Sequence, residues 1–166
     1  KPNEILLEMN NDLKETNPTG TFITSIVGRY NMNSDIVEIA NAGHQPALLK
    51  IEKDFKEFPS SSMPLAVVKH NNKSVYQLES FKLNGGRIYC FTDGFSACMD
   101  ENKQEIGIDG VKELILKHEN SSLRKELENA TEEIRLKSLK KDTIEKGIKE
   151  NSDILDDDLT IIGIGK

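Results

Sequence analysis

The stretch Arg87-Ile88-Tyr89-Cys90-Phe91-Thr92-Asp93-Gly94 decides how the fold is interpreted. Its first five residues are mostly aromatic, β-branched or otherwise apolar, which predicts a buried β-strand. Asp93 follows that strand directly. A carboxylate beside an apolar strand is costly unless it is solvated, hydrogen-bonded or bound to a cation. Because an Asp-Gly pair after a strand is also a common turn, this stretch alone is consistent with either a turn or a cation site.

A second acidic segment has the same relation to a predicted strand. Asp156-Asp157-Asp158 precedes Leu159-Thr160-Ile161-Ile162-Gly163-Ile164, an apolar run that predicts a strand. Three successive aspartates repel one another, and a bound cation would relieve that repulsion, although a solvated acidic loop is the ordinary alternative. If the two strands are neighbours, Asp93 and Asp157 can share a metal. Oxygen ligands alone favour Mg²⁺ or Mn²⁺ over zinc.

The remaining sequence predicts both helices and strands. Apolar residues recur at helical spacing in three segments: Pro2–Lys14, Val111–His118 with Asp109 as its N-cap, and from Ser121 or Ser122 to about Lys149 with a break near residues 140–143. Residue types indicate strands at Thr21–Tyr30, Asp35–Ala40, Ala47–Ile51, Val75–Leu83 and Arg87–Phe91. Asn84-Gly85-Gly86 predicts a hairpin between the last two of these strands. Since no repeat or linker divides the sequence, residues 1–166 are expected to form a single domain.

The composition argues against several classes of protein. The net charge of −6 disfavours nucleic acid and anionic membranes as partners. No apolar run approaches the ~20 residues of a membrane-spanning helix, and no signal-peptide pattern occurs at the N-terminus. The two cysteines, Cys90 and Cys98, are too few for a disulfide scaffold and lack metal-ligand spacing. A reducing, cytoplasmic location is therefore expected.

His44 lies in a segment with distinctive backbone chemistry, Asn41-Ala42-Gly43-His44-Gln45-Pro46. Because a histidine titrates near neutral pH, His44 is a candidate general acid. A structural role, in which His44 fixes the turn by hydrogen bonds, is the alternative that the residues favour.

Five motifs, taken in order, resemble the SpoIIE-like branch of the PPM-type metal-dependent serine/threonine protein phosphatases of bacteria. They extend over nearly the whole chain and are Thr21–Ser25, Ile39–Leu49, Met63–Ala66, Phe91–Ser96 and Asp157–Thr160. The resemblance implies an α+β fold, part of an α-β-β-α sandwich with mainly antiparallel sheets. It also implies a centre of two Mn²⁺ or Mg²⁺ ions, at which a metal-activated water attacks the phosphorus in line without a phosphoenzyme.

The same resemblance assigns roles to individual residues. Asp93 and Asp157 match the catalytic metal ligands. Four further residues match supporting positions in the motifs: Gly94, Asp158, Thr160 and His44. Ala66 departs from the family pattern, where glycine is more frequent, so the resemblance does not fix the local loop geometry.

The earlier motifs of the family, which supply further acidic metal ligands, do not occur in this sequence. The chain is therefore expected to be the C-terminal portion of a PPM-type phosphatase domain, and inactive or weak by itself. The resemblance implies a phosphoprotein substrate, for instance an anti-anti-sigma-type regulator, and an N-terminal sensor or receiver domain in the full-length protein. A homodimer is a further expectation. The alternative function is a non-catalytic pseudophosphatase module that binds a protein or senses a metal.

Overall fold

The computed structural model describes residues 1–17, 20–100, 102–120, 122–146 and 158–165, with the backbone alone for residues 138–146. The helices and strands of these ranges are, in chain order, α1 (Pro2–Thr16), β1 (Ser25–Asn31), β2 (Ile36–Ala42), β3 (Ala47–Ile51), β4 (Asp54–Phe58), the 3₁₀ turn η1 (Lys73–Val75), β5 (Glu79–Lys82), β6 (Arg87–Phe91), α2 (Asp93–Ser96), α3 (Gly107–Lys117), α4 (Leu123–Lys146) and β7 (Ile161–Ile164). Within the described ranges, no helix has the length and apolar character needed to cross a membrane.

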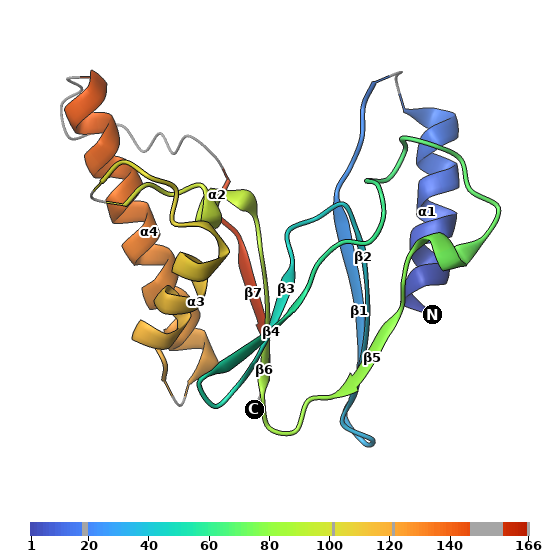
Figure 1. Cartoon of the computed structure of the whole chain (residues 1–166), viewed down its shortest axis with the longest axis horizontal. Coiled ribbons are helices and arrows are strands. Elements are labelled where there is room, and N and C mark those ends of the chain that lie inside the picture. The colour runs from blue at the N-terminus through green and yellow to red at the C-terminus, as the bar shows by residue number, and fades with distance from the viewer. Residues whose placement is uncertain (18–19, 101, 121, 147–157, 166) are drawn as a thin grey trace.

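The described strands form two antiparallel sheets that pack face to face, with helices on both outer surfaces (Figure 1). The strand order is β1-β2-β5 in the first sheet and β4-β3-β6-β7 in the second. Helix α1 covers the first sheet, whereas α3 and α4 cover the second. The predicted α+β class and the α-β-β-α sandwich with antiparallel sheets are therefore confirmed.

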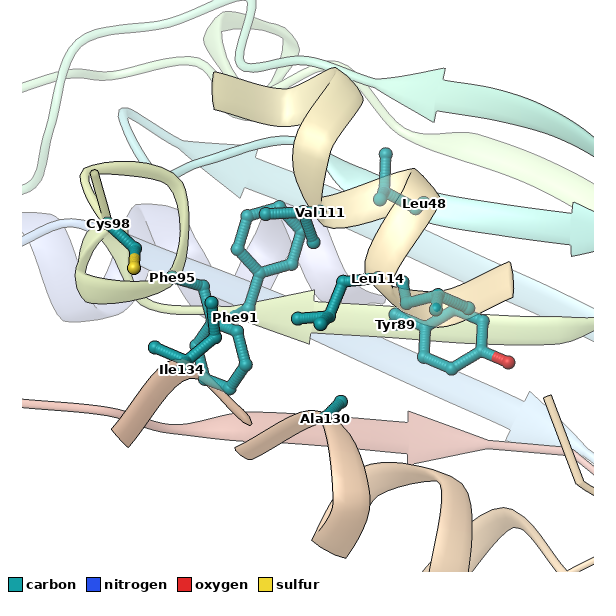
Figure 2. Close-up of a cluster of buried hydrophobic side chains, with 10 residues drawn as sticks. Leu48, Tyr89, Phe91, Phe95, Cys98, Val111, Leu114, Ala130 and Ile134 are labelled. Atoms are coloured by element: carbon teal, nitrogen blue, oxygen red, sulfur yellow. The ribbon is translucent and has the colours of Figure 1, made fainter. Parts of the chain in front are cut away.

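Each pair of neighbouring layers encloses its own hydrophobic cluster. Val37 and Ile39 of β2 pack with Leu49 of β3 between the two sheets. Figure 2 shows the cluster between the second sheet and helices α3 and α4, which includes Phe91, Phe95, Val111, Leu114, Ala130 and Ile134. The ring centroids of Phe91 and Phe95 lie 6.4 Å apart in an edge-on arrangement. Because Phe91 precedes Asp93 by two residues and Phe95 follows it by two, this packing anchors the turn that carries Asp93.

The Asn84-Gly85-Gly86 segment does not form the predicted hairpin. Strand β5 pairs with β2 in the first sheet, and β6 pairs with β3 in the second, so the segment crosses between the sheets. Asp35 fixes the start of this crossing, because its carbonyl accepts a hydrogen bond from the Leu83 amide and its carboxylate accepts one from the Asn84 amide, at 3.0 and 2.8 Å. The predicted strand 75–83 is shortened to Glu79–Lys82, since Val75 belongs to the 3₁₀ turn and Tyr76 is the C-cap of that turn.

Two predictions about the helices are also wrong. Helix α3 begins at Gly107 with Ile106 at its N-cap, so Asp109 lies within the first turn and does not cap the helix. Helix α4 continues without a break through residues 140–143. Its many charges are not all solvated, because Glu126 is only 1% exposed. The Glu126 carboxylate accepts hydrogen bonds from the Tyr89 hydroxyl, from Arg87 Nη1 at 2.5 Å and from the Asn120 amide at 3.1 Å.

The edge strands of the two sheets differ in their side chains. Strands β1, β4 and β5 carry charged residues, which discourage pairing with further strands. Strand β7 consists of three isoleucines and a glycine, and Ile162 and Ile164 are exposed. Its inner neighbour is β6, with Cys90 opposite Ile162 and Ile88 opposite Ile164.

Candidate metal centre

The two aspartate motifs meet where β6 ends and β7 begins. Strand β6 pairs with β7 in an antiparallel register that places Phe91 opposite Ile161. Beyond this pair, the Thr92 amide donates to the Thr160 carbonyl at 3.0 Å. Asp93 is the next residue and begins the short helix α2. The two strands are therefore neighbours, which is the condition for a metal shared between the two motifs.

Side-chain contacts fasten this junction. The Thr92 hydroxyl donates to the Asp158 carbonyl at 2.7 Å and accepts from the Thr160 amide at 3.0 Å. Gly94 is buried directly against the same segment, and a Cβ atom at Gly94 would lie 2.8 Å from the Asp158 carbonyl oxygen. The backbone of Asp158 is thus held close to the turn that carries Asp93.

The carboxylates themselves lie at the surface. Asp93 and Asp158 are exposed, and no described residue donates a hydrogen bond to the Asp93 carboxylate. Asp157 lies outside the described residues, so its role as a metal ligand stays a prediction. Thr160 is exposed, and its contribution in the structure is made by its backbone, through the two bonds to Thr92.

His44 lies in the loop that faces this edge of the sheets. Its Nδ1 is 3.0 Å from the Thr24 hydroxyl, and the two atoms share a hydrogen bond. Burial lowers the pKa of His44, while the negative charge of Asp93 acts in the opposite direction. The imidazole is therefore mainly neutral at pH 7 and lies within the electrostatic reach of Asp93.

The loop around His44 has a fixed shape. Asn41 is 7% exposed; its Oδ1 accepts from the His44 amide at 2.9 Å, and its Nδ2 donates to the carbonyls of His44 and Gln45 at 3.2 and 3.1 Å. The Ser60 hydroxyl accepts from the Gly43 amide at 2.7 Å. Gly43 has a φ of +69°, which glycine adopts without strain. The Asn41 and Ser60 side chains fix this turn, whereas the His44 ring is bonded to Thr24.

Ala66 lies near this loop and holds a left-handed conformation, with a φ of +67°. Glycine is preferred in that conformation because it has no Cβ atom. The Ala66 amide donates to Asn10 Oδ1 at 3.0 Å, and the preceding residue, Leu65, forms a β-bridge with Ile23. The surrounding bonds thus hold an alanine in a conformation typical of the glycine that the related motif more often contains.

The donors at the junction fit a hard divalent cation in part. Carboxylate oxygens are the ligands that Mg²⁺ and Mn²⁺ prefer, and Asp93 is free to coordinate. No group of three or more His, Cys, Asp or Glu side chains that could hold a metal ion occurs among the residues that the structure describes. The described part of the chain thus supplies an incomplete ligand set.

Sequence reasoning missed two residues that shape this site. The sequence indicates only that Thr92 lies at a strand end and Thr24 within a predicted strand, whereas in the structure both use their hydroxyl groups to bind segments distant in sequence. The Thr92 hydroxyl reaches a residue 66 positions further along the chain. A hydroxyl residue at a strand end is the signal that was available, but it does not identify the partner.

Comparisons with known proteins point to one group of relatives. The family model described as Stage II sporulation protein E (SpoIIE) matches residues 1–165. Phosphoserine phosphatase RsbU of Bacillus subtilis (strain 168) is 26% identical over 101 residues, which cover 61% of this chain and 30% of that protein.

Solved structures share the fold. The SiaA-PP2C domain of Pseudomonas aeruginosa matches with a TM-score of 0.75 at 15% identity, over 99% of this chain and 61% of that one. The phosphatase domain of SpoIIE from Bacillus subtilis matches with a TM-score of 0.56 at 11% identity, over 98% of this chain and 65% of that one. The chain therefore spans less than two thirds of the length of each of these relatives.

Proposed function

Because the chain belongs to the SpoIIE family, we propose that it is the C-terminal portion of a PPM-type phosphatase domain that hydrolyses phosphoserine or phosphothreonine on a bacterial regulatory protein. The observation that carries this function is the junction of Thr92 with β7, which holds the Asp158 backbone beside the turn of Asp93. The partial coverage of the relatives supports a longer domain, to which this chain contributes one part.

Asp93 and Asp157 would hold Mn²⁺ or Mg²⁺ in this function, and Asp158 would support them from the adjacent position. When bound, two such ions would acidify a water molecule and neutralise charge on the phosphoryl oxygens. The chain itself adds His44, which Thr24 and the Asn41 loop hold in place. A neutral imidazole in that position can donate a hydrogen bond to a phosphoryl oxygen.

Phosphate release by the full-length protein, with Mn²⁺ and a phosphoserine peptide, tests this function. Loss of a residue that only supports a metal ligand lowers activity about 10- to 100-fold. Asp93→Asn and Asp157→Asn remove the proposed ligands themselves, so each is expected to lower kcat/KM by more than that. Asp54→Asn is the matched control, because Asp54 is exposed in the β3–β4 hairpin, and its activity should equal that of the wild type. Unchanged phosphate release in both Asp93→Asn and Asp157→Asn would contradict the two-metal assignment.

The chain alone is expected to be inactive or weak, because the acidic ligands of the earlier family motifs do not occur in its sequence. Calorimetric titration of the chain with Mn²⁺ should show binding no tighter than roughly millimolar. Tight stoichiometric binding would show that the ligand set of this chain is sufficient.

The proposed substrate is a phosphorylated regulator of the anti-anti-sigma type, and the proposed upstream partner is an N-terminal sensor or receiver domain in a cytoplasmic protein. The exposed edge of β7 supports a homodimer as the assembly. The alternative function is a non-catalytic module. A full-length wild-type protein that binds its phosphoprotein partner with Mn²⁺ present, yet releases no phosphate, would establish that alternative.

A further inference from the structure

Thr92 occupies the N-cap of helix α2, but its side chain makes no cap hydrogen bond. A threonine at this position ordinarily accepts a hydrogen bond from an amide in the first turn of its own helix. Here the hydroxyl is directed toward the other aspartate motif, where it donates to the Asp158 carbonyl at 2.7 Å and accepts from the Thr160 amide at 3.0 Å. The Thr92 side chain thus joins two segments, while its backbone begins the helix.

The backbone explains why a hydroxyl is needed at this position. In a regular antiparallel ladder, Thr92 and Thr160 would exchange both of their amide-to-carbonyl bonds. One of these is present, since the Thr92 amide donates to the Thr160 carbonyl at 3.0 Å. The other is replaced, since the Thr160 amide donates to the Thr92 hydroxyl at 3.0 Å, while the Thr92 carbonyl accepts from the Phe95 amide at 3.1 Å.

The Thr92 hydroxyl replaces that missing acceptor. It binds the Thr160 amide in place of the backbone carbonyl, so the chain can begin α2 at Asp93 without losing the ladder bond to β7. The same hydroxyl uses its own proton to hold the Asp158 carbonyl. One side chain therefore fixes both the turn that presents Asp93 and the segment that contains Asp158.

We propose that Thr92 is a positioning residue of the proposed metal centre, which sets the placement of Asp93 relative to the Asp158 backbone through its hydroxyl group. This role rests on the proposed phosphatase function. It is supported independently by Gly94, where a Cβ atom would lie 2.8 Å from the Asp158 carbonyl oxygen. The junction thus requires a hydroxyl at one residue and the absence of a side chain two residues later.

The test compares Thr92→Val with Thr92→Ser in the full-length protein. Valine keeps the size and branching of threonine but removes both side-chain hydrogen bonds, whereas serine keeps the hydroxyl. Thr16→Val is the matched control, because the exposed Thr16 hydroxyl donates to the Asp12 carbonyl within its own helix. Three quantities are measured: amide hydrogen exchange at Thr160 in the metal-free protein, Mn²⁺ affinity by calorimetry, and kcat at saturating Mn²⁺.

Thr92→Val is expected to accelerate exchange at the Thr160 amide about fivefold or more, since that amide loses its acceptor. The same variant should weaken Mn²⁺ binding by about 10- to 100-fold, the effect of losing a group that orients a ligand. At saturating Mn²⁺ its kcat should stay within a few-fold of the wild type. Thr92→Ser should keep the wild-type exchange rate at Thr160 and the wild-type Mn²⁺ affinity, and so should Thr16→Val.

Mn²⁺ affinity within twofold of the wild type in Thr92→Val would overturn the role of Thr92, provided that Asp93→Asn abolishes binding in the same assay. If Asp93→Asn also binds Mn²⁺ normally, the proposed metal centre is wrong as well. If Thr92→Val does not fold, Gly94→Ala is measured in its place. Gly94 lies in α2, so alanine fits its backbone, and its Cβ would meet the Asp158 carbonyl oxygen at 2.8 Å and the Leu159 side chain at 3.0 Å. It should weaken Mn²⁺ binding similarly, and unchanged affinity would again overturn the inference.

Discussion

The buried carboxylate of Glu126 joins helix α4 to strand β6, and removing it shows how much stability one charged side chain supplies. Glu126 is 1% exposed and Arg87 is 13% exposed, with 2.5 Å between Arg87 Nη1 and Glu126 Oε2. The Tyr89 hydroxyl donates to the other carboxylate oxygen. Burial raises the pKa of Tyr89, and the hydrogen bond to Glu126 raises it further, so this hydroxyl stays protonated and remains a donor.

Glu126→Ala should destabilise the protein by about 4 kcal/mol, since breaking a buried ion pair typically costs about 3–5 kcal/mol. The variant leaves Arg87 with the Asn120 carbonyl at 2.7 Å as an acceptor, which limits the loss. It also leaves the Tyr89 hydroxyl and the Asn120 amide without the carboxylate, and a buried donor without a partner costs about 1–3 kcal/mol. These contributions overlap, because all of them belong to one network.

Urea unfolding followed by circular dichroism measures this loss. With a slope of about 2 kcal/mol per M, the midpoint for Glu126→Ala should fall by about 2 M. Glu128→Ala is the matched control on the same helix, because Glu128 pairs with Arg124 at the surface, and it should leave the midpoint nearly unchanged. The double variant Arg87→Met/Glu126→Leu should lose less than Glu126→Ala, since it leaves no buried charge. A loss below about 1 kcal/mol in Glu126→Ala would refute this reasoning.

Two further predictions concern a charged cluster and a glycine. Burial alone would raise the pKa of Glu133, but hydrogen bonds from Lys117, His118 and Lys137 lower it to about 2, below the ordinary 4.5. The wild type should therefore be more stable than Glu133→Gln by its full margin above pH 4.5, and this margin should shrink as the pH falls toward 2. Urea unfolding at pH 6 and pH 2.5 measures the margin, and equal values at the two pH values would contradict the prediction. Gly43→Ala should lower the thermal midpoint more than Gly85→Ala, because both have positive φ but only Gly43 would place its Cβ 2.5 Å from Pro64 Cγ. Alanine in the left-handed region costs about 1–2 kcal/mol, so equal midpoints for the two variants would show that the Pro64 contact is harmless.

Sequence patterns predicted those elements whose burial is evident from their own residue types. Strand β3 was predicted at its observed bounds, and β6 likewise, because their apolar residues are buried on both faces. Strand β4 was missed, since Asp54–Phe58 contains three charged residues and two phenylalanines at a sheet edge and does not resemble a core strand. The crossing at Asn84-Gly85-Gly86 was read as a hairpin because local turn chemistry does not reveal which sheet the next strand joins.

The residues of the candidate site were likewise predicted in part and missed in part. Asp93 and the Asp157–Asp158 segment were identifiable, because a carboxylate next to an apolar strand is unusual. The hydroxyl of Thr92 and the burial of Glu126 were not, since each depends on a partner that is distant in sequence. Periodicity describes which face of an element is apolar, whereas these contacts depend on how separate elements are placed against one another.

The pairing of β6 with β7 also has a consequence for biosynthesis. About 70 residues separate Phe91 from its partner Ile161, so one side of β6 stays unpaired while those residues are translated. At about 5–20 residues per second, this interval lasts roughly 4–14 s. During that time the nascent chain exposes an apolar strand edge, which is the kind of surface that chaperones bind. The junction that brings the two acidic segments together is therefore among the last parts of the sandwich to assemble.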